Sequence, residues 1–156
     1  MHAPQAVEIG NLQLLGAIVE QAPDAIIFAD REGLIRTWNR GAERVFGHVA
    51  AEVTGRSLDV IVPERLRRAH WEGFHQAIAT GRTKYEGRAL TTRSMHKDGS
   101  KLYVELSFAV VTDPTGTAIG SLAIGRDCTA RHAAEVASRE RISMLEKALE
   151  AASRQA

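Results

Sequence analysis

The hydrophobic positions near the start of the chain repeat first at helical and then at strand spacing. Leucine, isoleucine and valine recur three and four residues apart over 12–19, which predicts a helix that Asn11 could cap and that Pro23 closes. The apolar run 25–29 predicts a buried strand. Residues 34–38 predict its hairpin partner across a turn at 30–33. Residues 1–10 have no such period and are expected to form a disordered leader.

A group of helices is predicted after this hairpin. Residues 39–47 and 49–54 predict two short helices, and each is followed by a glycine, Gly47 or Gly55, suited to a left-handed helix end. Residues 63–80 predict a longer helix, with a proline in its first turn and Gly81 at its end.

After Gly81 the hydrophobic period changes to two. Residues 84–96 predict a long strand, and the turn Lys97-Asp98-Gly99-Ser100 joins it to a strand with a clean alternation, followed by a last strand at 118–126. The apolar face of the middle strand carries Leu102, Val104, Leu106, Phe108 and Val110. From Ala130 onward proline and glycine disappear, which predicts a single helix. Its seam consists of Ile142, Leu145, Leu149 and Ala152.

This order of elements predicts an α+β fold. Consecutive hairpins imply an antiparallel sheet, and the helical insert between its two halves is expected to cover one sheet face and to enclose a ligand cavity. We expect three segments: a leader at 1–10, a sensory domain with an N-terminal helix at 11–129, and a linker helix with a coiled-coil-like seam at 130–156.

Composition excludes several functional classes. The chain has 156 residues and a formal charge of +1, which attracts neither nucleic acid nor anionic lipid. No apolar run approaches the length of a membrane span, so we expect a cytoplasmic protein. The single cysteine, Cys128, cannot form an internal disulfide and is expected to be a small apolar residue near a strand end. No catalytic triad order, phosphate loop, paired-carboxylate motif or metal box is present, so we do not expect an enzyme.

Three stretches resemble the PAS family of sensory domains. They are APDAIIFADREGLIRTWNRGAERVFG (22–47), HKDGSKLYVELSFAVV (96–111) and IGSLAIGRDCTARHAAE (119–135), in the order and spacing of that family. The resemblance covers about residues 12–130. It implies a five-stranded antiparallel sheet, frequent dimers, and a link through Asp127 and Thr129 to an output helix. The light-sensing flavin branch carries an adduct-forming cysteine in its helical insert, and this insert has none.

The stretch RRAHWEGFHQAIATGRTKYEG (67–87) resembles the heme-binding gas-sensor branch, which includes rhizobial oxygen-sensor kinases and direct-oxygen-sensor phosphodiesterases. The resemblance implies heme b with His70 as its proximal ligand. Helical spacing agrees, because Leu66, Gly73, Phe74 and Ala77 are expected on the same face as His70, whereas His75 points elsewhere. A core histidine without a cofactor, or one on the helix surface, fits the same pattern.

The distal side of this predicted site departs from the branch. Leu90 stands where oxygen-binding relatives carry an arginine, and Arg88 stands where the phosphodiesterases carry a methionine ligand. Met95 could approach if the strand register slipped. We expect the pocket to be lined mainly by apolar side chains, which favours CO or NO over O2. The predicted cofactor-binding residues are Leu66, His70, Gly73, Phe74, Tyr85, Arg88, Leu90, Leu106, Phe108 and Leu122, with His70 as metal ligand.

Two functions remain open at this point. The first is a heme-based sensor of a diatomic gas or of redox state, which relays its signal through the C-terminal helix to a downstream signalling domain or partner protein. The second is a cofactor-free module for dimerisation or protein interaction, or a sensor of an apolar metabolite. In both cases we expect a homodimer held by the helix at the start of the chain and by the C-terminal seam.

Overall fold

The computed structural model describes residues 10–155, so all but the last residue of the predicted leader lies outside the described residues. The elements in chain order are α1 (Asn11–Gln21), β1 (Ala25–Asp30), β2 (Ile35–Trp38), α2 (Arg40–Phe46), α3 (Ala50–Val53), the 3-10 turns η1 (Leu58–Val60) and η2 (Glu64–Leu66), α4 (Arg67–Thr80), β3 (Leu90–Met95), β4 (Lys101–Thr112), β5 (Ala118–Asp127) and α5 (Thr129–Gln155).

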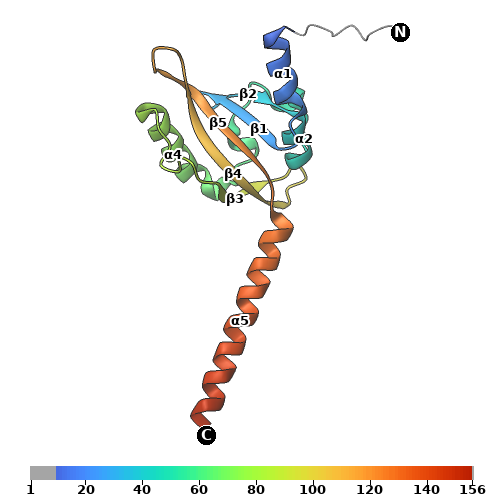
Figure 1. Cartoon of the computed structure of the whole chain (residues 1–156), viewed down its shortest axis with the longest axis vertical. Helices are drawn as coiled ribbons and strands as arrows, with labels where there is room; N and C mark the ends of the chain where they lie inside the picture. The colour runs from blue at the N-terminus through green and yellow to red at the C-terminus, as the bar shows by residue number, and fades with distance from the viewer. Residues whose placement is uncertain (1–9, 156) are drawn as a thin grey trace, which may run out of the picture.

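The five strands form one antiparallel sheet in the order β2-β1-β5-β4-β3 (Figure 1). β5, the last strand in sequence, lies at the centre and pairs with both β1 and β4. The helical insert α2 to α4 interrupts the chain between the two halves of the sheet, as the sequence predicts, and the α+β architecture is confirmed.

The register divides the sheet into two faces, because side chains alternate along each strand. The inner face carries the buried side chains of β1 and β4, among them Ile27, Val104 and Leu106. These pack with Phe46 of α2 and Phe74 of α4 into one hydrophobic core. The insert therefore covers the inner face.

The outer face carries the alternate residues of the same strands. Phe28 pairs with Leu122, and Leu122 pairs with Ala109, so these side chains point away from the insert. α5 begins beside this face: Tyr103 of β4 donates its backbone N–H to the Thr129 hydroxyl over 2.9 Å. From there α5 extends away from the domain (Figure 1).

The Asn39 side chain joins α1, β1 and α2. Its side chain is 1% exposed and accepts hydrogen bonds from the N–H groups of Ile26 in β1 and Ala42 in α2, at 2.8 and 2.9 Å. Its amide nitrogen donates to the carbonyls of Val19 in α1 and Asp24 over 2.8 and 3.0 Å. One side chain thus caps α2 and fixes α1 and β1 against it.

Three predicted boundaries are wrong. Gly10, not Asn11, occupies the cap position of α1, and no side chain caps that helix. The helix predicted over 63–80 is split into η2 and α4, because its first residues after Pro63 form a 3-10 turn. The strand predicted from Lys84 begins at Leu90, since residues 84–87 form a turn in which Gly87 has a φ of 73°.

Candidate functional site

His70 lies on the face of α4 that packs toward the sheet. Phe74 is the buried residue of this helix, and the half-buried residues recur around it at helical spacing: Arg67, His70, Trp71, Ala77 and Ile78. His75, one residue beyond Phe74, is exposed. The predicted orientation of the two histidines is therefore confirmed.

The imidazole of His70 is surrounded by aromatic rings and has a free nitrogen. Its ring centroid lies 4.9 Å from that of Trp71, edge to face, and 6.3 Å from that of Phe74. Its Nδ1 atom is buried and has no hydrogen-bond partner among the described residues. Burial lowers the pKa of His70 below its ordinary value, Asp59 opposes this shift and His75 adds to it. At neutral pH the ring is therefore uncharged, the form that binds iron.

The sheet surface beyond α4 is apolar at the positions that the sequence analysis selected. Leu90 pairs with Leu106, and Phe108 pairs with Ala123, so these side chains share the inner face. The register does not slip: Met95 pairs with Lys101 and lies on the opposite face from Leu90. Met95 is thereby removed as a candidate ligand.

The segment before β3 contributes fewer side chains to the predicted cofactor pocket than the sequence indicates. Arg88 is exposed, as a solvated residue would be, and its N–H donates to the Tyr85 carbonyl over 3.0 Å. Tyr85 is half-buried in the turn, with Lys84 Nζ 4.8 Å from its ring centroid. Leu66 is half-buried at the end of η2.

Two predicted pocket residues are misplaced. Gly73 is exposed, and a Cβ added there would meet no atom within 4 Å, so the expectation that it faces the sheet is wrong. Gly73 lies three residues after His70, at the edge of the buried stripe of α4, and this edge faces solvent. The prediction that Leu122 belongs to the cofactor-binding residues is also wrong, because Leu122 pairs with Phe28 on the outer face.

The space between α4 and the sheet is filled by core side chains. Phe74 and Leu106 belong to the buried cluster, and Trp71 and Phe108 pack against it. Trp71 covers Gly33 so closely that any side chain there would collide with its ring, and Trp71 Nε1 donates to Asp59 Oδ1 over 2.8 Å. The donor chemistry of His70 fits heme iron, whereas room for a macrocycle requires these side chains to move.

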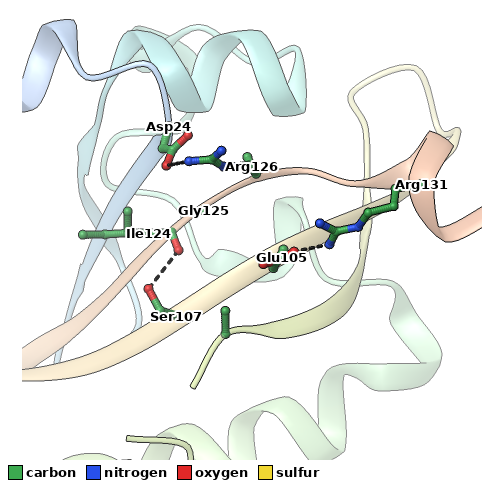
Figure 2. Close-up of a pocket in the computed structure, with 8 residues that line it drawn as sticks. Asp24, Glu105, Ser107, Ile124, Gly125, Arg126 and Arg131 are labelled. Carbon is green, nitrogen blue, oxygen red and sulfur yellow. Dashed lines mark hydrogen bonds and ion pairs between the residues drawn. The ribbon is translucent and has the colours of Figure 1, made fainter. Parts of the chain in front are cut away.

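A pocket of about 260 Å³ lies instead on the outer face, beside the start of α5 (Figure 2). Its lining consists of Asp24, Ala89, Glu105, Ser107, Ile124, Gly125, Arg126 and Arg131. Two ion pairs cross it: Arg126 Nη2 lies 2.8 Å from Asp24 Oδ2, and Arg131 pairs with Glu105. A second pocket of about 260 Å³ lies between the end of α4 and the β4–β5 turn. His70 lines neither of them.

Sequence reasoning missed the contacts that fix α5 to β4. Arg131 binds Glu105, and His132 stacks on Tyr103 with ring centroids 3.9 Å apart. The alternation of β4 already placed Tyr103 and Glu105 on the outer face together, so an aromatic and a carboxylate there could have indicated a docking point for the next element.

Residues 10–155 also bear on metal binding and on membrane insertion. No three His, Cys, Asp or Glu side chains of these residues gather in a way that could hold a metal ion. None of the described helices combines the length and hydropathy that a membrane span requires.

Comparison with known proteins identifies the fold. The family model described as "PAS fold" matches residues 13–128, about three quarters of the chain. The oxygen sensor protein DosP of Escherichia coli is 27% identical over 99 residues, which cover 64% of this chain and 11% of that protein. The sensor protein FixL of Bradyrhizobium diazoefficiens is 28% identical over 93 residues, which cover 60% of this chain and 18% of that protein. This chain thus spans less than a fifth of either relative.

A solved structure agrees with this assignment. The crystal structure of the PAS domain of a protein from Colwellia psychrerythraea superposes with a TM-score of 0.65 at 22% identity, covering 78% of this chain and 99% of that one. At that identity the similarity bears on the fold alone.

Proposed function

This chain belongs to the PAS family, and we propose that it is a sensory domain that holds heme b through His70. The observation that carries the proposal is the state of the His70 side chain: it lies on the inner face of α4, is uncharged at neutral pH, and has a buried Nδ1 without a partner among the described residues. A neutral imidazole that faces an apolar surface is a common axial ligand of heme iron in proteins. The similarity to DosP, named an oxygen sensor, supports the same proposal.

The residues that would surround the group are those of the inner face near His70. Phe74 and Leu66 lie on its own side, and Leu90, Leu106 and Phe108 lie on the sheet. Bound heme would supply an iron atom for a diatomic gas or for an electron. These side chains would exclude water and offer no hydrogen-bond donor to a ligand, which suits CO or NO better than O2. Sensing would involve residues 11–129, in a cytoplasmic setting, with residues 130–156 as the relay to a downstream domain or partner.

The experiment is a hemin titration followed by absorption spectroscopy. The unmodified chain and His75→Ala should give the same Soret band, whereas His70→Ala should lose it, because only His70 faces the sheet. His75→Ala is the matched control, since it removes the same side chain five residues further along α4, on the exposed side. Equal loss in both variants, or no band in any of the three proteins, would contradict the assignment.

A cofactor-free dimerisation module is the second candidate. Two helices outside the core carry exposed apolar side chains: Leu12 and Leu15 in α1 are 86% and 53% exposed, and α5 has a similar row. The interior between α4 and the sheet is also occupied by side chains of the hydrophobic core, which favours a domain without a cofactor. Light scattering on the full chain and on a version ending at Arg131 tests this candidate. A monomer at about 10–100 µM, where weak dimers form, would exclude it.

A further inference from the structure

We propose that the pocket on the outer face of the sheet binds a small free amino acid. The ligand carboxylate would contact the two arginines of the lining and the ligand ammonium its two acidic side chains: Arg126, Arg131, Asp24 and Glu105. The pocket and His70 lie on opposite faces of the sheet, so the inference goes beyond the proposed heme site and does not depend on it. A volume of about 260 Å³ is slightly below the usual range for drug-sized ligands, which indicates a small metabolite.

The first argument is the alternation of charge around the pocket (Figure 2). Arg126 of β5 pairs with Asp24, which precedes β1, and Arg131 of α5 pairs with Glu105 of β4. The two ion pairs are neighbours, because Glu105 and Arg126 lie directly opposite each other in the register of β4 and β5. Acidic and basic side chains therefore alternate, in the order Asp24, Arg126, Glu105, Arg131. The four charges cancel, so the pocket favours neither a simple anion nor a simple cation.

The second argument is the bonding capacity that the two ion pairs leave unused. A guanidinium has five N–H donors, and among the described residues Arg126 uses one nitrogen, Nη2, which donates to Asp24 Oδ2 over 2.8 Å. Arg131 Nη2 donates to Glu105 Oε2, and Arg131 Nε lies 3.7 Å from Glu135. Asp24 Oδ1 and Glu105 Oε1 accept no hydrogen bond from another described residue. A ligand that carries both charges can therefore bind here without breaking either ion pair.

A free α-amino acid supplies both charges within a small volume. Its carboxylate and its ammonium are attached to the same carbon, so they can reach an arginine and a carboxylate that are neighbours on adjacent strands. The side chain of the ligand would lie over Ile124 and Ala89, the aliphatic part of the lining. Ile124 is half-buried and lies on the outer face, because it pairs with Ser107. The lining therefore favours an aliphatic amino acid such as leucine.

A bound amino acid would contact the sheet and α5 together. Arg131 belongs to the first turn of α5, whereas Glu105 and Arg126 belong to β4 and β5. Charge-assisted hydrogen bonds from one ligand to these three residues would strengthen the attachment of the helix to the sheet. The pocket is therefore placed to couple an amino acid to α5 without using the inner face.

An NMR titration of the isotope-labelled chain tests the ligand class with three probes. L-leucine should shift the amide signals of Gly125, Arg126 and His132 with a dissociation constant of about 1 mM, since the charges of the pocket are partly exposed. N-acetyl-L-leucine lacks the ammonium charge and L-leucinamide lacks the carboxylate, so each should bind about tenfold more weakly. Equal binding of either analogue would show a simple anion or cation site and overturn the proposal. No shift of these signals up to about 20 mM L-leucine, or shifts confined to α4, would overturn it as well.

Two variants and a control test the location of the site. Arg126→Gln should raise the dissociation constant of L-leucine about tenfold, because it removes a guanidinium that holds the ligand carboxylate. Glu105→Gln should reduce the preference for L-leucine over N-acetyl-L-leucine, because the ligand ammonium loses one of its two carboxylates. Arg36→Gln is the matched control: it removes an exposed arginine that pairs with Asp30 and does not line the pocket, and it should leave both constants unaltered. Equal weakening by Arg36→Gln, an unchanged constant in Arg126→Gln, or an unchanged preference in Glu105→Gln would overturn the site.

Discussion

Replacing Asn39 by alanine should destabilise the domain more than its position in a loop between a strand and a helix suggests. The substitution removes the cap of α2, which is worth about 1 kcal/mol, and leaves the Ile26 N–H and the carbonyls of Val19 and Asp24 without their partner. A buried polar group left unpaired costs about 1–3 kcal/mol, although water reaches some of these groups once the amide is gone. The expected loss in free energy of unfolding is about 3–5 kcal/mol, a large share of the usual total of about 5–15 kcal/mol.

Urea denaturation followed by circular dichroism measures this loss. Asn11→Ala is the matched control: Asn11 is exposed in the first turn of α1, and its replacement should change the free energy of unfolding by less than about 0.5 kcal/mol. A third variant, Asn39→Asp, keeps the two accepted bonds but turns a carboxylate oxygen toward the carbonyls of Val19 and Asp24. It should be destabilised as well. A loss below about 1 kcal/mol for Asn39→Ala, or a fully stable Asn39→Asp, would refute the role of the side chain as a joint.

Three further outcomes are expected. Gly125→Ala should lower the free energy of unfolding by about 1–3 kcal/mol, because a Cβ there collides with the Glu105 backbone. In the same urea experiment Gly16→Ala in α1 should be neutral or slightly stabilising, because its Cβ meets nothing within 4 Å. Burial lowers the pKa of His70 in the folded state, so the unfolded chain takes up a proton at a higher pH than the folded one. The free energy of unfolding should therefore fall as the pH drops below about 6.5. His70→Leu should make that fall smaller in urea midpoints measured from about pH 7 to 5. Arg131→Ala should speed amide hydrogen exchange in the first turns of α5 and leave the centre of β5 unchanged, and equal rates in α5 would contradict the ion pair with Glu105 as its anchor.

The sequence predicted those parts of the structure that depend on local patterns. The alternation in β4, the Asp-Gly turn before it and the period of α4 are properties of neighbouring residues, so the sheet and the inner position of His70 followed from them. The hydrophobic pattern predicts too early a start for β3 because Tyr85 and Leu90 fit an extended pattern, while the turn at Gly87 that separates them carries little signal in one sequence.

The candidate site was harder to predict because it depends on which strands become neighbours. The prediction of Leu122 as a pocket residue requires the inner face. In a strand a shift of one residue exchanges the two faces, and the pairing with Phe28 places Leu122 on the outer one. Gly73 was misplaced for a related reason: residues three and four apart share a helix face only partly, and Phe74 rather than Gly73 marks its centre. The hydrogen bonds of Asn39 with Val19 and Ile26 join segments distant in sequence, and no local sequence pattern predicts them.

Because α5 is attached only at its base, a small tilt there moves its far end by a larger distance. The hydrogen bond from Tyr103, the stack on His132 and the ion pair of Arg131 all lie within its first four residues, Thr129 to His132. With about 1.5 Å of rise per residue, the remaining helix is roughly 35 Å long, so a tilt of about 5° at its base moves the far end by about 3 Å. A displacement too small to disturb the packing of the sheet could thus change which side chains make contact at Leu149 and beyond. The size of the movement depends on the length of the helix rather than on the strength of any single contact.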